Sequence, residues 1–236
     1  MKRILLMVFR NIFRVPFYWC KLCYMAAHVD NYTEPERFAF LKKIVQMANW
    51  GGNVTIEVHG IENIPSEDGF IIYPNHQGLY DALALVDVSP TPISAVIKKE
   101  AVGIPFIKQC VACLKAYAID REDLRQSMGV INSVVKEVKN GRNYVIFAEG
   151  TRSRKGNELL DFKGGSFKAA QKAKCPIVPV ALIDSFKPFD TNSAAPVTVQ
   201  VHFLPVMEYE EYKDMKTVDI AAEVKRRIEE KIAERI

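Results

Sequence analysis

The chain of 236 residues lacks an uninterrupted apolar stretch of the length that a membrane-spanning helix needs, which is about 20 residues. Its most apolar segment, residues 2–29, is interrupted by charges at positions 2, 3, 10, 14 and 21. A transmembrane anchor is therefore disfavoured. The chain also lacks low-complexity runs and internal repeats, and its hydrophobic content of 49% supports a sizeable folded core rather than disorder.

Cysteine is scarce, and its spacing does not fit a metal site. The five cysteines form two Cys-x-x-Cys pairs, Cys20 with Cys23 and Cys110 with Cys113, and a single Cys175. The pairs lie much farther apart than zinc ligands usually do, and each lies in an apolar, helix-like stretch where cysteine serves as a small hydrophobe. We predict no metal site. The odd count and the lack of a secretory signal favour a reducing, cytosolic setting.

Positive charge is scarce outside the N-terminal segment. The net charge is +4, of which residues 1–50 hold +5 and the remaining residues hold −1. A nucleic-acid binder would need a basic patch with base-reading or stacking groups, so no nucleic-acid partner is expected. A basic and apolar arm suits an anionic membrane surface better.

The N-terminal segment 2–29 predicts an amphipathic helix. Its basic side chains fall near one helical face, at spacings of 7, 4 and 7 residues (Arg3, Arg10, Arg14 and Lys21). The opposite face is broad and aromatic-rich, which is typical of a helix lying in a membrane interface with its cations reaching the headgroups. Pro16 is a candidate kink in this helix. Packing of the segment on the rest of the protein, or on a partner subunit, stays open.

A second helix is predicted from Pro35 to Asn49, with Thr33 as its N-cap. The pair Gly51-Gly52 then marks a boundary. We expect a two-helix membrane-binding arm over residues 1–50 and a catalytic domain over residues 51–236.

The rest of the chain alternates strand-like and helix-like segments. Strands are predicted at 54–59, 70–74, 93–97, 117–119, 143–147, 177–183 and 197–203. Helices are predicted at 80–88, 104–115, 122–139, 166–173 and 217–235. This alternation predicts an α/β fold, with a largely parallel or mixed central sheet flanked by helices.

Two polar clusters follow predicted strands. His76 and Asp81 come directly after the apolar run 70–73, and the cluster Glu149-Gly150-Thr151-Arg152-Ser153 follows the run 144–147. An imidazole held by a carboxylate is suited to remove a proton from an alcohol. On one regular helix the two side chains would point about 140° apart. They meet only if the chain turns at Gly78 and a helix begins near residue 80.

The second cluster has the chemistry of an anion site. Gly150 allows close backbone approach, Thr151 offers a hydroxyl, and Arg152 offers a planar fork suited to phosphate. Exposed N–H groups of such a turn also suit an anion. In α/β enzymes the active site is commonly formed by polar residues at the ends of buried strands, so these two clusters predict one.

At this point the chain resembles the glycerolipid acyltransferases, specifically the 1-acyl-sn-glycerol-3-phosphate acyltransferases. Four blocks over roughly residues 54–205 carry the resemblance. They are Asn75 to Asp81; Lys98-Lys99-Glu100 with Ile104-Pro105-Phe106 and Tyr117 to Arg121; Phe147 to Ser153 with Phe162-Lys163-Gly164-Gly165; and Val178 to Ala181. Ala101 and Ala118 depart from the family, which more often has larger apolar residues there, and neither departure touches the polar chemistry.

The resemblance implies acyl transfer from a thioester, acyl-CoA or acyl carrier protein, to a lysophospholipid acid at a membrane. His76 would be the general base and Asp81 its orienting carboxylate. Arg152 is the leading phosphate ligand, with Lys98, Arg121 and, more weakly, Lys163 as further candidates. Glu149 would bind the glycerol region or organise the basic groups, while Gly150 and Thr151 shape the turn. No further cofactor is expected. Family members work on membrane lipids, so peripheral association with the cytoplasmic face of a membrane is expected.

Three alternatives remain from the sequence. The acceptor could be glycerol 3-phosphate or a lysolipid without phosphate, water could replace the alcohol in a thioesterase, or the protein could be an inactive membrane-binding scaffold. The chain has no Gly-x-Ser-x-Gly motif, which argues against an esterase with a serine nucleophile. The intact His76, Asp81, Glu149 and Arg152 argue against the scaffold.

Overall fold

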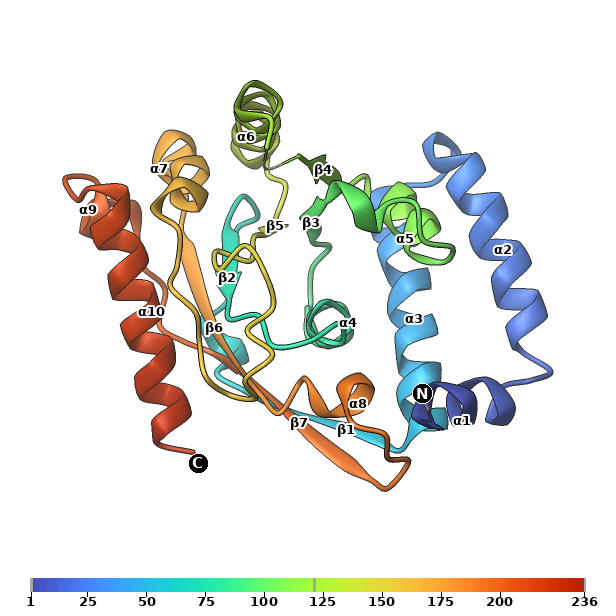
Figure 1. The fold of residues 1–236 in the computed structure, drawn as a ribbon. Helices are drawn as coiled ribbons and strands as arrows, with labels where there is room; N and C mark the ends of the chain where they lie inside the picture. Colours follow the sequence, from blue (N-terminus) through green and yellow to red (C-terminus); the bar gives the residue numbers. More distant parts are fainter. Residues whose placement is uncertain (1, 121, 236) are drawn as a thin grey trace.

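Apolar segments between polar turns build one seven-stranded sheet in the computed structural model, which describes residues 2–120 and 122–235 (Figure 1). The order of strands within this part of the chain is β1-β7-β6-β2-β5-β3-β4. Their bounds are β1 Val54–His59, β2 Ile71–Pro74, β3 Ser94–Lys98, β4 Tyr117–Ile119, β5 Tyr144–Val145, β6 Ile177–Ile183 and β7 Val197–Phe203.

The sheet is mixed but mostly parallel, as predicted. Among the described residues, β6 and β7 pair antiparallel, and every other neighbouring pair of strands is parallel. The central strands β2 and β6 are buried along their whole length, because helices cover both faces of the sheet. His202 lies buried in β7 and stacks on His59 of β1, with ring centroids 4.4 Å apart. It is therefore a sheet residue, as predicted.

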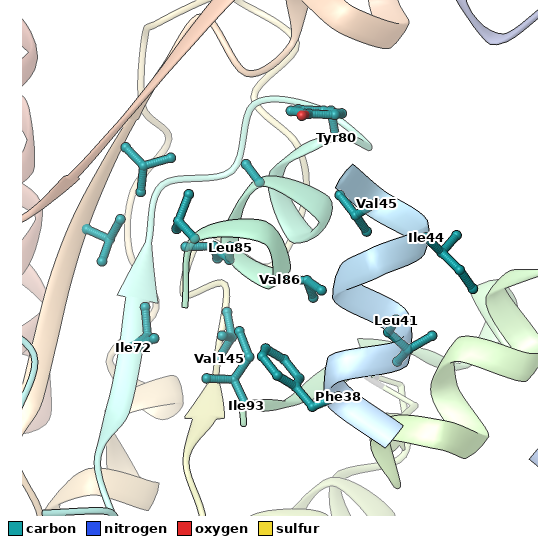
Figure 2. Packing of buried hydrophobic residues seen from close by; sticks show 14 of the residues in the cluster. Phe38, Leu41, Ile44, Val45, Ile72, Tyr80, Leu85, Val86, Ile93 and Val145 are labelled. Atoms are coloured by element: carbon teal, nitrogen blue, oxygen red, sulfur yellow. The ribbon is translucent and has the colours of Figure 1, made fainter. Parts of the chain in front are cut away.

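Helices cover the two faces unequally. The bounds are α1 Lys2–Arg10, α2 Val15–Ala27, α3 Glu34–Gly52, α4 Asp81–Val88, α5 Ile107–Leu114, α6 Leu124–Lys139, α7 Lys168–Ala173, α8 Lys187–Asp190, α9 Tyr209–Tyr212 and α10 Thr217–Ala233. One core packs α3 and α4 against Ile72 and Val145 (Figure 2), and the other packs α6, α7 and α10 against Ile71 and Tyr73. Adjacent residues of β2 thus point into opposite cores.

Several helix and strand bounds differ from the sequence prediction. Helix α5 begins at Ile107 rather than at residue 104, because Phe106 has a positive φ of 72° that no helix can contain. Helix α6 begins at Leu124, after Asp123 accepts a hydrogen bond from the N–H of Gln126 as an N-cap. Strand β5 is only two residues long. The short helices α8 and α9 were not predicted.

The N-terminal segment is two helices and not the single helix that the sequence predicted. The chain turns between α1 and α2, where the N–H groups of Arg14 and Val15 both donate to the carbonyl of Asn11. Pro16 does not kink a continuous helix but lies in the first turn of α2, where its missing N–H is tolerated. Within the described residues, no helix is both long and apolar enough to cross a membrane.

Gly51 and Gly52 belong to α3, so they are a packing surface rather than a linker. A Cβ atom on Gly51 would lie 2.5 Å from Nδ2 of Asn11, and one on Gly52 would lie 2.4 Å from Cε of Met7. The two glycines therefore let α1 approach the C-terminal end of α3 closely. Helix α3 itself contributes five residues to the first core. The division into a 1–50 arm and a 51–236 catalytic domain stays a prediction.

The side chains of Arg3, Arg10, Arg14 and Lys21 each contact α3 or the residue that follows it. Arg3 is buried and donates to the carbonyl of Gly52 at 2.5 Å, and Arg10 donates to Oδ1 of Asn53 at 2.5 Å. The partial negative charge at the C-terminal end of a helix favours such cations. Farther along, Arg14 lies over the ring of Trp50 and Lys21 over the ring of Phe40. Arg3 is buried and does not reach headgroups, whereas Arg10, Arg14 and Lys21 remain exposed, so for these three the expectation stays a prediction.

Many apolar side chains of the segment are exposed. They are Ile4, Leu5, Val8, Phe9, Ile12, Phe13, Phe17, Trp19 and Tyr24, with Trp50 of α3 beside Arg14. We call this set the apolar arm surface.

Candidate active site

The polar clusters lie on loops at one edge of the sheet. Strands β2, β5 and β3 are parallel to one another, and β6 is parallel to β2, so their carboxyl ends meet at the same edge. The loop after β2 carries His76, the loop after β5 carries Glu149 to Arg152, and the loop after β6 carries Asp184 to Phe186. The fold thereby gathers three sequence-distant segments.

The structure brings His76 and Asp81 together as predicted. Their atoms Nδ1 and Oδ2 are 2.7 Å apart, and Asp81 is the buried first residue of α4. The main-chain N–H groups of Gln77 and Gly78 also donate to Oδ2, at 2.7 and 3.0 Å. The chain therefore turns before the helix begins and wraps its N–H groups around the carboxylate, which the positive end of α4 also favours.

Gly78 is needed here for space and not for a special backbone angle. A Cβ atom on Gly78 would lie 2.8 Å from Oδ2 of Asp190 and 2.9 Å from Cα of Phe186. Its φ lies outside the positive region that favours glycine. The chain turns at Gly78, as predicted, but glycine is needed there because of close neighbours and not because of its backbone freedom.

The orientation of His76 leaves one ring nitrogen available. Because an ionised Asp81 only accepts, Nδ1 carries the proton toward it and Nε2 presents a lone pair. Among the described residues, no hydrogen bond engages Nε2. The ring also stacks on Phe147, with centroids 4.1 Å apart, so its plane is fixed from a second side.

Glu149 joins the two polar clusters through the main chain. Its Oε1 accepts from the N–H of His76 at 2.7 Å, and its Oε2 accepts from the N–H of Leu160 at 3.1 Å. The N–H of Ser153 donates in turn to the carbonyl of His76 at 2.8 Å. The Glu149 side chain is buried, and burial raises its pKa to about 7. Glu149 thus holds the main chain at His76 and at Leu160, and both of its predicted roles, binding the glycerol region and organising the basic groups, stay predictions.

The turn after Glu149 approaches Lys163 closely. Gly150 has a positive φ of 77°, and a Cβ atom there would lie 3.0 Å from Nζ of Lys163. Thr151 is exposed beside it, and Arg152 is half-buried. The turn thus combines the predicted tight backbone with two basic side chains.

Arg152 lines a cavity of about 450 Å³ together with a basic residue that the sequence analysis missed. The cavity lies between the 152–156 loop and the segment that follows β6, and its lining residues are Arg152, Arg154, Gly156, Phe186, Asp190 and Thr191. Arg154 adopts a positive φ of 56°, which is uncommon for a residue with a side chain. Within the described residues, neither arginine forms an ion pair, so both guanidinium groups are available to an anion.

The two remaining predicted substrate ligands are Lys98 and Arg121. Lys98 ends β3, is exposed, and pairs with Glu100 at 3.1 Å. It does not line the Arg152 cavity. Arg121 lies outside the described residues. Its neighbour Asp120 pairs with Lys99 at 3.3 Å.

Buried amide side chains, also missed from the sequence, attach the His76 loop to β6. Asn75 accepts from the N–H of Leu182 at 2.7 Å and donates to its carbonyl at 3.0 Å. Gln77 donates to the same carbonyl at 2.9 Å and to Oδ1 of Asn157 at 2.8 Å. Only the positions of Asn75 and Gln77 beside His76 could have signalled this role. The main chain of Leu182, one residue after the fourth block of the resemblance, thus holds the His76 loop.

Comparison with known proteins identifies the family. Residues 55–183, which are more than half of the chain, match the family model described as Acyltransferase. The chain belongs to the acyltransferase family. This agrees with the resemblance of its motifs, and the protein is an acyltransferase enzyme.

Individual relatives carry a more specific name. The chain is 34% identical to the 1-acyl-sn-glycerol-3-phosphate acyltransferase of Escherichia coli, over 70% of this chain and 67% of that protein. It is 29% identical to the protein of the same name from Borreliella burgdorferi, over 75% of this chain and 72% of that protein. The fold is similar to the crystal structure of the 1-acyl-sn-glycerophosphate acyltransferase PlsC from Thermotoga maritima, with a TM-score of 0.74, 20% identity and 97% of each chain covered.

Proposed function

We propose that this acyltransferase transfers a fatty acyl group from an acyl thioester to the free sn-2 hydroxyl of 1-acyl-glycerol 3-phosphate, forming phosphatidic acid. The contact between Nδ1 of His76 and Oδ2 of Asp81 carries the proposal, because it leaves Nε2 available as a base. The loop that carries Arg152 and Arg154 is hydrogen-bonded to His76 through the N–H of Ser153, and among the described residues neither arginine forms an ion pair. The names of the similar bacterial enzymes support the choice of acceptor.

In the proposed reaction, Nε2 of His76 removes the proton of the acceptor hydroxyl as its oxygen attacks the thioester carbonyl. The tetrahedral intermediate collapses with cleavage of the carbon–sulfur bond, and the leaving thiolate takes the proton from the imidazolium. Asp81 holds the ring and stabilises the imidazolium without taking the proton. The thioester is already activated, so no covalent acyl-enzyme is required.

The acceptor phosphate would bind in the Arg152 cavity. Arg152 and Arg154 supply two guanidinium forks, which suit the oxygens of a phosphate monoester. Gly150 and Thr151 would shape the turn that carries Arg152, and Glu149 would hold that turn against His76. Lys98 and Arg121 remain proposed substrate ligands at the neighbouring strand ends, where the phosphate groups of a thioester donor are an alternative target.

The apolar arm surface would hold the enzyme at the membrane that contains its acceptor. Phe9 and Phe13 are among its most exposed side chains, and insertion of such residues at an interface removes apolar area from water. The inward-facing Arg3 and Arg10 would brace α1 from behind. We propose peripheral attachment at the cytoplasmic face, where either acyl-CoA or acyl carrier protein would have access.

The test is an assay of the purified protein with lysophosphatidic acid and a long-chain acyl thioester, following thiol release with and without the acceptor. The proposal expects acceptor-dependent release and formation of phosphatidic acid. Parallel reactions with acyl-CoA and with acyl carrier protein identify the donor. Glycerol 3-phosphate and a lysolipid without phosphate serve as competing acceptors.

Other outcomes would assign other activities. Release of thiol at the same rate without an acceptor would indicate a thioesterase. Product formed only from glycerol 3-phosphate, or only from the lysolipid without phosphate, would replace the proposed acceptor. No release with either donor and any of these acceptors would contradict acyl transfer as proposed.

A further inference from the structure

The carboxylate of Asp81 has a partner that neither polar cluster of the sequence contains. The hydroxyl Oγ of Ser185 lies 2.6 Å from Oδ1 of Asp81, across 104 positions of the chain. Ser185 is 0% exposed and follows the carboxyl end of β6. Because β6 is parallel to β2, its end delivers Ser185 beside the loop that carries His76.

The Ser185 hydroxyl has two acceptors in reach but only one proton to donate. Oδ1 of Asp81 is at 2.6 Å, and Oε1 of Gln77 is at 3.0 Å. The shorter contact is to an ionised carboxylate, and a charge-assisted hydrogen bond is the stronger one. Oε1 of Gln77 already accepts from the main-chain N–H of Ser185 at 3.1 Å. The proton therefore belongs to the bond with Asp81.

The Ser185 contact completes the hydrogen bonding of the carboxylate. Oδ2 accepts from His76 and from the N–H of Gln77, whereas Oδ1 accepts from Ser185 and, at 3.2 Å, from the N–H of Gly78. Without the hydroxyl, Oδ1 would keep only this longer contact. The carboxylate could then rotate, and the direction in which Asp81 holds the imidazole would be less well defined.

We propose that Ser185 is a positioning residue, which fixes Asp81 so that Nε2 of His76 points at the acceptor hydroxyl. The proposal rests on the roles of His76 and Asp81 in the proposed function. The next residue, Phe186, lines the Arg152 cavity, and the preceding residue, Asp184, accepts a hydrogen bond from Asn157. One turn after β6 therefore contributes both to the cavity and to the contact with Asp81.

The test compares Ser185→Ala with Ser94→Ala. Ser94 is a matched control because it is 1% exposed and its hydroxyl also makes a buried contact, to the carbonyl of Leu114 at 3.0 Å, on the side of the sheet near β4. Ser185→Ala is expected to lower kcat about tenfold with little change in KM, because a hydrogen bond to a charged group is lost. Ser94→Ala is expected to keep the wild-type kcat. Ser185→Thr retains a hydroxyl and is expected to exceed the alanine variant in kcat.

Two readouts separate positioning from a purely structural role. A carboxylate with one donor fewer attracts the imidazolium more strongly, so the acid limb of the kcat profile of Ser185→Ala is expected to move to higher pH. The proton on Nδ1 of His76, followed by NMR without any substrate, is expected to shift in Ser185→Ala and not in Ser94→Ala. This second readout does not depend on the identity of the acceptor.

The proposal is overturned if Ser185→Ala keeps the wild-type kcat and pH profile. It is also overturned if folded Ser185→Thr and Ser185→Ala both leave the Nδ1 proton signal where the wild type has it. If the wild-type protein turns over no acceptor but the Nδ1 signal shifts in Ser185→Ala, the proposed function is contradicted. The proposal that Ser185 positions Asp81 and His76 is then still supported.

Discussion

The main-chain N–H of His76 donates to Oε1 of Glu149 at 2.7 Å, although 73 positions of sequence separate the two residues. The same carboxylate holds the N–H of Leu160, and the N–H of Ser153 reaches back to the carbonyl of His76. The base and the arginine-bearing turn are thus parts of one hydrogen-bonded unit. A change at Glu149 is therefore expected to act on both of them.

Burial of the Glu149 side chain makes stability depend on pH. The pKa of Glu149 is raised to about 7 by burial, from an ordinary value of 4.5, so the folded state binds this proton more tightly than the unfolded state. Its contribution to stability is therefore greatest below about pH 4.5 and declines as the pH rises toward 7, by up to roughly 3 kcal/mol.

Glu149→Gln removes this titration. Urea unfolding at about pH 5 and about pH 8 is expected to show a smaller stability gap between wild type and variant at the higher pH. A gap that stays constant, or widens with pH, would show that Glu149 does not titrate as inferred.

Replacing His76 is expected to affect turnover alone, whereas replacing Asp81 is expected to affect both turnover and stability. His76→Ala should lower turnover by about 10²–10⁴-fold and leave the melting temperature close to wild type, since the half-buried ring holds no other element in place. Asp81→Asn should lower turnover and also destabilise the fold by about 1–3 kcal/mol, because an amide NH₂ cannot accept from the N–H of Gln77 or Gly78. Steady-state kinetics and thermal melts measure both. Activity of His76→Ala above a few per cent would refute the base assignment.

Arg152→Ala is expected to raise the KM for the lysophospholipid about tenfold to a hundredfold, with a smaller effect on the KM for the donor, because a charged fork facing the phosphate is lost. The KM of Arg152→Lys for the lysophospholipid should lie between those of the wild type and Arg152→Ala, since lysine keeps the charge but lacks the planar guanidinium group. Lys155→Ala removes a charge from the same loop outside the cavity lining and serves as the control. If only the KM for the donor changed, Arg152 would not be the ligand of the acceptor phosphate.

Introducing charged residues into the apolar arm surface is expected to weaken membrane binding. Phe9 and Phe13 are 71% and 96% exposed, so replacing both by aspartate should leave the fold intact. Binding to anionic lipid vesicles is expected to fall at least about tenfold, because each phenyl ring contributes roughly 1.5–3 kcal/mol on insertion. Val218→Asp, at a position that is 60% exposed on α10, is the control. Equal vesicle binding by the double variant and the control would exclude this surface as the membrane contact.

Gly51→Ala should loosen α1 from α3. The new methyl group would lie 2.5 Å from Nδ2 of Asn11 and 3.1 Å from the carbonyl oxygen of Met7, where the amide of Asn11 already donates. We expect a destabilisation of about 1–3 kcal/mol and faster proteolysis or amide exchange in α1. Gly129→Ala in α6 meets nothing within 4 Å and should be neutral or stabilising by up to about 1 kcal/mol. If α1 in Gly51→Ala were as well protected as in wild type, the close packing would be disproved.

Local sequence signals predicted most elements because these depend on periodicity and capping. The apolar runs predicted each strand of the sheet, and Thr33 predicted the start of α3, where its hydroxyl accepts from the N–H of Glu36. The same signals predicted only a boundary at Gly51 and Gly52. A glycine pair is typical of a linker, but it also permits close helix packing, and only the position of α1 distinguishes the two.

The N-terminal segment shows the same limit. Spacing placed its basic side chains on one face, and the structure keeps them on one side, yet it turns that side toward α3. An amphipathic pattern predicts that a helix has one polar and one apolar face. It does not say which face the rest of the chain will cover, because that depends on the carbonyl groups and aromatic rings that α3 offers to the cations.

Residue type and short spacing predicted the mixed α/β sheet and the pairing of His76 with Asp81, and the structure contains both. The anion-binding role of Arg152 depends on the same kind of signal and stays a prediction. Tertiary structure alone decided that Ser185 holds Asp81, that Glu149 joins the two clusters, and that Arg154 shares a cavity with Arg152. Parallel strand order brings these groups to one edge of the sheet, and the order of strands in space is not written in any local pattern of the chain.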